Sequence, residues 1–164
     1  MKLKTFIVVI LKIQVKAHWP SFEYIVLTKI LMDNHQQKIS HLKALFHLAT
    51  ADGELSKSEL VYIMNVAERL GINREEILNF DGSEPALVLP DLQHTHYAIF
   101  HRLAIVIMID NVASESEKRY CFNLGVKMGL HPNAVGEIIE HVVTEGPMKA
   151  NPTAILAIFR KYMS

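Results

Sequence analysis

Two short turns of this sequence carry carboxylates at a spacing that suits a cation site. Asp52 ends one apolar run and Glu59 opens the next, and Asp110 and Glu117 repeat the arrangement further along the chain. Oxygen ligands of this kind are those that Ca²⁺, Mg²⁺ and Mn²⁺ take in proteins. Clustered carboxylates repel one another, so a bound cation would relieve that repulsion. If the two turns converge in space, the four residues form a site for a divalent cation.

The same residues also have an interpretation that needs no metal. Ser56 and Ser114 stand three residues before Glu59 and Glu117, respectively. This is the spacing of a capping box, in which the serine and glutamate side chains bind free backbone N–H groups at a helix start. An aspartate before glycine, as at Asp52, is ordinary turn chemistry. Spacing alone therefore leaves both interpretations open.

The two turns belong to an internal repeat. Beyond residue 38 the chain is similar to itself at an offset of 58 residues, without a gap. Each unit has the pattern of a helix, an acidic turn and a second helix that ends at a glycine. The identical pairs are Leu45 and Leu103, Asp52 and Asp110, Ser56 and Ser114, Ser58 and Ser116, Glu59 and Glu117, Tyr62 and Tyr120, Asn65 and Asn123, and Gly71 and Gly129. Apolar positions of one helix face repeat as well: Leu42, Leu45, Phe46 and Ala49 match Phe100, Leu103, Ala104 and Ile107, and Ile63, Met64, Ala67 and Leu70 match Cys121, Phe122, Gly125 and Met128.

Composition and periodicity predict an all-α fold. Half of the 164 residues are hydrophobic, and the few glycines and prolines fall at segment borders, which is typical of a helical globular protein. We predict a single-domain helical bundle with about six to eight helices from residue 38 onward, built from two pseudo-symmetric helix-pair repeats. The last helix, 153–163, has one apolar face, which either closes the bundle or docks a partner or a twin subunit.

The charge balance and the cysteine content argue against two classes of protein, the general nucleic-acid binders and the disulfide-bonded proteins. The 17 basic and 17 acidic side chains balance, so the chain lacks the charge of a general nucleic-acid binder. Cys121 is the only cysteine, which excludes an intrachain disulfide. Its apolar surroundings predict a buried core thiol. We therefore expect a reducing, cytoplasmic location.

Residues 1–31 differ from the remainder. They hold five lysines against one acid, Glu23, and residues 11–16 alternate between apolar and polar types as a strand does. Three interpretations stay open: a basic strand or helix packed on the domain, a degenerate export signal, or an upstream start codon. We favour the third, in which the native protein begins at Met32 and the domain covers 32–164. No function is placed in the extension.

Two other chemistries have weaker support. The nine histidines, and "HTHYAIFH" in particular, invite a zinc site. His94 and His101 share a helix face but lie about 10 Å apart along it, so zinc is not favoured and solvent-facing histidines are expected. No phosphate-binding loop, nucleophile elbow or zinc-protease motif occurs. We expect no enzyme; a hydrolase with a histidine beside Asp52 or Asp110 is the alternative.

The stretch "LATADGELSKSELVYIMNVAERLGI" resembles the tellurite-resistance TerB-like family, which also occurs at the front of certain membrane-anchored DnaJ-type co-chaperones. Residues 49–72 carry the motif, and "IMIDNVASESEKRYCFNLGVKMGL" carries a weaker second copy, so that the resemblance covers roughly 38–145. The second turn has Asn111 in place of glycine. The sequence therefore does not determine whether this turn bends in the same way as the first. The resemblance implies an all-α bundle without catalytic activity, links to stress responses and membrane-associated assemblies, and a metal site at Asp52, Glu59, Asp110 and Glu117.

Two functions therefore stand as hypotheses. The first is a non-catalytic metal-binding or sensing module in which Ca²⁺, Mg²⁺ or Mn²⁺ stiffens the paired acidic turns. The second is a metal-free helical adaptor. Expected partners are proteins, in a membrane-associated complex or a homodimer, and not nucleic acid. Four carboxylates gathered around one point would favour the ion, whereas carboxylates that each cap their own helix would favour the adaptor.

Overall fold

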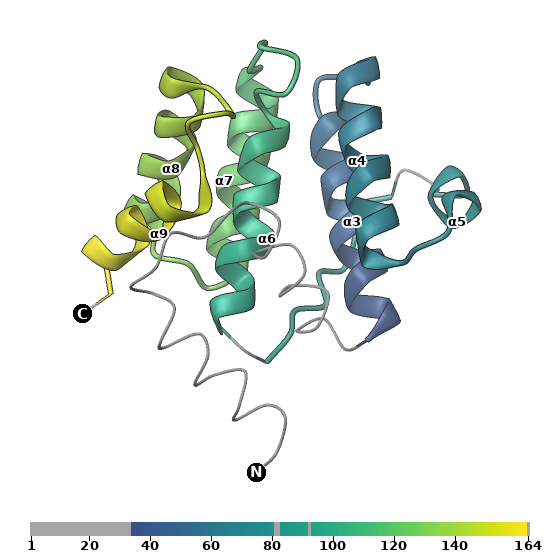
Figure 1. Cartoon of the computed structure of the whole chain (residues 1–164), viewed down its shortest axis with the longest axis horizontal. Helices are drawn as coiled ribbons and strands as arrows, with labels where there is room; N and C mark the ends of the chain where they lie inside the picture. Colours follow the sequence, from purple (N-terminus) through teal and green to yellow (C-terminus); the bar gives the residue numbers. More distant parts are fainter. Residues whose placement is uncertain (1–33, 81–82, 92, 164) are drawn as a thin grey trace.

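The computed structural model describes residues 34–80, 83–91 and 93–163 (Figure 1). These residues form helices and loops and include no strand, which confirms the all-α prediction. The predicted extension 1–31 and the start at Met32 lie outside them, so that boundary stays a prediction. The helices are α3 (His35–Ala49), α4 (Lys57–Leu70), α5 (Arg74–Leu78), α6 (Gln93–Val106), α7 (Glu115–Lys127), α8 (Pro132–Glu145) and α9 (Pro152–Lys161).

The helix boundaries follow the repeat. α3, α4 and α5 begin at residues 35, 57 and 74, and α6, α7 and α8 begin 58 residues later, at 93, 115 and 132. The first two helices of each unit also have similar lengths. The third helix differs, since α5 has 5 residues and α8 has 14. The spatial pseudo-symmetry of the two units stays a prediction.

The second helix of each unit ends in the same way. Gly71 and Gly129 have φ angles of 73° and 77°, in the left-handed region that glycine adopts without steric cost. The N–H of Ile72 donates to the carbonyl of Ala67 at 2.9 Å, and the same bond recurs 58 residues on between Leu130 and Gly125, at 3.1 Å. These are the bonds of a Schellman motif, so the predicted glycine stops are confirmed.

Each of the described helices contributes buried side chains to the hydrophobic core. α3 packs on α4, α6 and α7, and α8 packs on α6, α7 and α9 (Figure 1). The predicted apolar faces are largely confirmed: Leu42, Leu45 and Ala49 of α3 and Phe100, Leu103, Ala104 and Ile107, on or just after α6, are fully buried. Cys121 is buried too, as predicted.

One position departs from the repeat. Phe122 is 36% exposed, although its match to Met64 places it on the core face. α7 buries Cys121, Leu124 and Gly125, and Phe122 follows Cys121 by one residue, which turns its side chain by about 100° around the helix axis. It therefore lies at the edge of the buried face.

The last helix closes the bundle on its apolar side. Ile155, Ile158 and Phe159 are buried, and the ring of Phe159 lies 4.3 Å from the ring of Tyr97 on α6. The Tyr162 hydroxyl donates to Glu137 of α8 at 2.8 Å. The predicted apolar face thus packs inside the chain.

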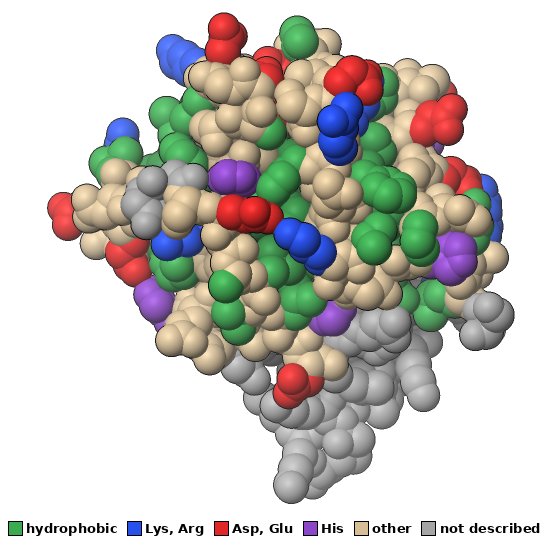
Figure 2. All heavy atoms as spheres, turned by 180° about the vertical axis from the view of Figure 1, so that it is seen from behind, with side chains coloured by type: hydrophobic (Ala, Val, Ile, Leu, Met, Phe, Trp, Pro, Cys, Tyr) green, Lys and Arg blue, Asp and Glu red, His purple; other side chains and the backbone are tan. Residues whose placement is uncertain are grey.

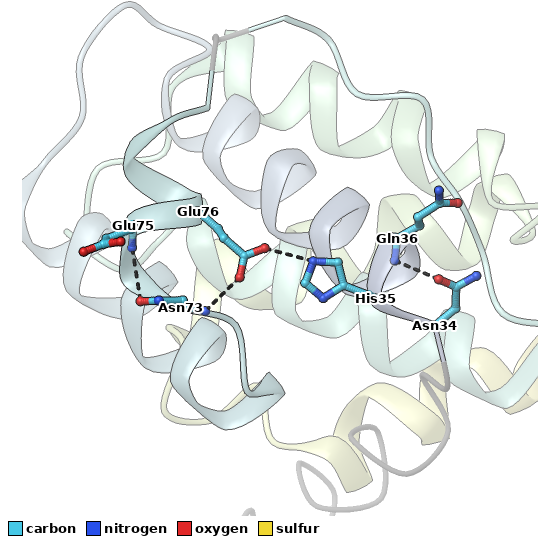
Figure 3. A network of polar contacts seen from close by, with 6 residues as sticks. All are labelled: Asn34, His35, Gln36, Asn73, Glu75 and Glu76. Atoms are coloured by element: carbon cyan, nitrogen blue, oxygen red, sulfur yellow. Dashed lines mark hydrogen bonds and ion pairs between the residues drawn. The ribbon is translucent and has the colours of Figure 1, made fainter.

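Short α5 is tied to the start of α3 by polar contacts on the surface. His35 points toward Glu76, and their Nε2 and Oε2 atoms are 2.9 Å apart (Figure 3). The same Glu76 accepts a hydrogen bond from the backbone of Asn73 at 3.3 Å. An exposed pair of this kind adds little stability. On the face seen from behind, acidic, basic and hydrophobic side chains are interspersed (Figure 2).

Candidate metal site at the acidic corners

The first acidic corner joins α3 to α4 with short-range hydrogen bonds. Asp52 Oδ1 accepts from the N–H of Glu54 at 3.0 Å, and Gly53 between them has a φ of 93°. The N–H of Ser56 donates to Glu59 Oε2 at 2.7 Å, and the N–H of Glu59 donates to Ser56 Oγ at 3.1 Å. The predicted capping box is therefore complete.

The second corner, between α6 and α7, has the same bonds. Asp110 Oδ1 accepts from the N–H of Val112 at 2.9 Å. The reciprocal bonds between Ser114 and Glu117 measure 2.8 and 3.1 Å. Asn111 has a φ of 67° and so takes the left-handed conformation that glycine has in the first corner. Asparagine tolerates this conformation better than most residues, so the second corner has a positive φ at this position without a glycine.

Both corners lie at the same end of the molecule (Figure 1). Glu59 and Glu117 are buried, with 4% and 2% of their surface exposed. Burial raises the pKa of Glu117, its hydrogen bonds with Ser114 lower it, and the negative charges of Glu59 and Asp52 raise it further. Carboxylates from the two corners therefore lie within electrostatic range of one another.

The corners as they stand do not form a metal cage. Among the described residues no group of three or more His, Cys, Asp and Glu side chains is placed to hold a metal ion. One oxygen of Glu59 and one of Glu117 accept from the backbone at the start of their own helix. Asp52 and Asp110 each accept within their own turn. The four-carboxylate site stays a prediction.

Two histidines, His41 and His101, are buried. His101 is 6% exposed and His41 is 2% exposed, so the expectation of solvent-facing histidines is wrong for His101. Its Nε2 lies 2.6 Å from the carbonyl oxygen of Ala150. Burial is the main cause that lowers the pKa of His101 to about 4, and it also lowers the pKa of His41. Both histidines are neutral at pH 7.

The helical spacing of the sequence could have indicated that His101 is buried. It stands four residues after Tyr97 and three before Ala104, both of which are buried, and this is the spacing of one helix face. Arg102, 5% exposed, carried no such signal. Its Nη1 lies 3.4 Å from Nε2 of His41 on α3, a contact between helices that periodicity does not predict.

Comparison with known families supports the resemblance found in the sequence. The family model of the tellurite resistance protein TerB matches residues 11–81. This range contains α3, α4 and α5 with Asp52 and Glu59, whereas Asp110 and Glu117 lie beyond it. No curated protein and no solved structure matches the chain. None of the helices in the described part of the chain is long and apolar enough to cross a bilayer.

Proposed function

Starting from the TerB-like region at residues 11–81, we propose that this chain is a non-catalytic module that binds a divalent cation at its paired acidic corners. Asp52, Glu59, Asp110 and Glu117 would supply the oxygen ligands. Ca²⁺, Mg²⁺ and Mn²⁺ are the candidates, since carboxylate oxygen suits hard cations. A bound ion would tie the start of α4 to the start of α7 and so couple ion concentration to the rigidity of the bundle.

The observation that carries this proposal is the effect of Glu59 and Asp52 on Glu117. Their charges raise the pKa of a buried carboxyl group that belongs to the other repeat. Negative charges that already repel one another across two helix starts are stabilised by a cation placed between them. Because ligands must lose their protons to bind, cation affinity is expected to fall as the pH is lowered through the raised pKa of Glu117.

Binding would require a local rearrangement. Asp52 would exchange its bond to the N–H of Glu54, and Asp110 its bond to the N–H of Val112, for bonds to the ion. The glutamates would keep one oxygen in the capping box and turn the other to the ion. The two aspartates lie in the turns themselves, whereas the two glutamates are buried in the first turns of α4 and α7.

The test is thermal unfolding of the full chain with and without Ca²⁺, Mg²⁺ or Mn²⁺, together with calorimetric titration of each ion. A ligand at a hundred times its dissociation constant adds about 2.7 kcal/mol to the free energy of unfolding. The variants Glu59→Gln and Glu117→Gln remove one charge each, while glutamine still serves in a capping box. Asp52→Asn and Asp110→Asn likewise keep an oxygen for the turn.

Stabilisation by one cation that all four variants weaken supports the site. Glu75→Gln is the matched control, because Glu75 is an exposed acid in the first turn of α5, outside both corners. Equal loss of binding in this control would point to diffuse charge effects. No stabilisation by any of the three ions contradicts the metal proposal.

A second function is favoured by a different observation. Both capping boxes are complete, and no metal-holding group occurs among the described residues. These facts suit a metal-free helical adaptor. Its proposed location is the cytoplasm, and its proposed partner is a protein, in a membrane-associated complex or a homodimer. Failure of every cation to bind, combined with dimerisation in sedimentation experiments, would favour the adaptor.

A further inference from the structure

A pocket with a volume of about 300 Å³ lies between α4, α6 and the connection from α8 to α9. Its volume is at the lower end of the range of about 300–1,000 Å³ that small-molecule sites have. It shares no lining residue with the acidic corners. The polar side chains that line it are those of Tyr62, Asn65, Arg69, His101, Arg102 and Asn151.

The charged side chains among the described residues that line this pocket are basic. Arg69 and Arg102 line it, and no acidic side chain does so among the described residues. Arginine keeps its charge at any physiological pH. The histidines His41 and His101 lie beside Arg102. Burial lowers the pKa of each, and the charge of Arg102 lowers it further. Burial raises the pKa of Tyr62 to about 12, and the charges of Arg102 and Arg69 act in the opposite direction and lower this pKa.

The remaining wall is apolar. Val66 and Leu70 of α4 and Ile105 of α6 line the pocket, and Pro147 and Met148 contribute from the α8–α9 connection. Met148 is 92% exposed, so an apolar side chain stands out toward solvent beside the pocket. A ligand that contacts both the arginines and the apolar side chains needs a negatively charged group and a short apolar body.

The pocket is held in shape by contacts between its walls. The Nε2 atom of His101 on α6 lies 2.6 Å from the carbonyl oxygen of Ala150. Asn151 follows directly and caps α9 by accepting from the N–H of Ala154 at 3.0 Å. A preformed site loses less free energy to ordering when a ligand binds.

We propose that this pocket binds a small organic carboxylate, with Arg69 and Arg102 on the carboxylate group and the apolar side chains of α4 and α6 on its hydrocarbon body. A guanidinium carries five N–H donors in a planar fork that matches a carboxylate. An arginine that already makes contacts inside the protein can therefore also bind a ligand. This site is independent of the proposed metal site, because it uses other residues.

The experiment is an NMR titration of the full ¹⁵N-labelled chain with hexanoate, hexanamide, acetate and inorganic phosphate. Hexanoate should shift backbone signals of the pocket, such as those of Arg69, Ile105 and Met148. Hexanamide, which lacks the charge, should bind about tenfold more weakly, since a hydrogen bond to a charged group contributes about 1.4 kcal/mol or more. Acetate keeps the charge but lacks four methylene groups of the apolar body, and the lost burial should weaken its binding by at least about tenfold. EDTA should leave hexanoate binding unchanged, which separates this result from that of the metal experiment.

Arg69→Gln should weaken hexanoate binding by about tenfold for the same reason. Arg69 is exposed, so the fold is expected to tolerate the change, and the free energy of unfolding checks this. Arg160→Gln, at an exposed arginine of α9 that is not among the pocket residues, is the matched control and should leave binding unchanged. The proposal is overturned if hexanamide or phosphate binds as tightly as hexanoate. Shifts confined to signals outside the pocket, or equal affinities of the two arginine variants, would also overturn it.

Discussion

The α3–α4 corner and the α6–α7 corner have the same hydrogen bonds at the same spacing, yet their sequences and surroundings differ. An aspartate bonds to the N–H two residues on, a left-handed residue follows it, and a serine–glutamate box starts the next helix. The left-handed residue is Gly53 in one corner and Asn111 in the other. Two different residues therefore support one bend, because both tolerate positive φ.

The two units differ more in their neighbouring elements than in their corners. The first is followed by the five-residue helix α5, and the second by the fourteen-residue helix α8. Lys43 of α3 is half-buried, with its amine 5.5 Å from the centre of the Phe80 ring. His101 stands 58 residues later, where it is buried and neutral against Ala150. The repeat thus conserves the corners, whereas each helix body adapts to its own neighbours.

The largest expected effect concerns positions 43 and 101 and is a change in how the free energy of unfolding depends on pH. The folded pKa of His101 is about 4, below the ordinary value of 6.5, so its contribution to stability is complete above pH 6.5 and is lost as the pH falls toward 4. This group alone accounts for about 3 kcal/mol of unfolding free energy. His101→Gln should remove this part of the pH dependence of chemical denaturation between pH 7 and 4, while the part due to buried His41 remains. Lys43→Gln should leave the pH dependence unchanged, and equal slopes in all three proteins would contradict the prediction.

The next effect tests the close packing of the second unit. A methyl group added at Gly125 would lie 2.7 Å from Cε2 of Phe100 and 2.8 Å from Cγ2 of Val135. Overpacking of this kind costs about 1–3 kcal/mol, and the better helix propensity of alanine offsets up to about 1 kcal/mol. We expect Gly125→Ala to lower the unfolding free energy by about 1.5 kcal/mol. The first unit has Ala67 at the same position, so an unchanged midpoint in urea would mean that the two units pack alike there.

A smaller effect is expected at the left-handed residue of the first corner. A Cβ atom at Gly53 would meet nothing within 4 Å, so the cost of a substitution comes from its φ of 93° alone. Gly53→Ala should destabilise the chain by about 1 kcal/mol. Gly53→Asn makes the first corner resemble the second and should cost less than alanine does. Thermal unfolding of both variants checks the order, and a reversed order would refute the shared-bend argument.

The smallest effect separates the cap from the charge at the second corner. Glu117→Gln keeps the capping box. It removes the negative charge of a carboxyl group whose neutral, protonated form the fold favours. The variant should be slightly more stable than the natural chain above the raised pKa of Glu117, and the difference should vanish as the pH falls below 4.5. Ser114→Ala removes the cap and should cost about 1 kcal/mol. A glutamine variant as unstable as Ser114→Ala in urea would show that charge is needed in the box.

The sequence by itself determined the elements whose bonds are local. Ser56 and Glu59 are three residues apart, and Ile72 bonds to Ala67 five residues back, so the helix starts, the glycine stops and the offset of 58 could be predicted from residue types and spacing. The apolar faces followed from the helical period for the same reason. The exception at Phe122 lies at the edge of its face, where a rotation of one residue decides exposure.

Only the tertiary structure decided which polar groups meet. His41 contacts Arg102 across 61 residues of sequence, and His101 contacts Ala150 across 49. The influence of Glu59 and Asp52 on Glu117 also crosses from one repeat to the other. Such contacts depend on how whole helices pack, and helix packing arises from the summed shape of many side chains, which no short pattern encodes. The neutral histidines and the arginine pocket are consequences of that packing.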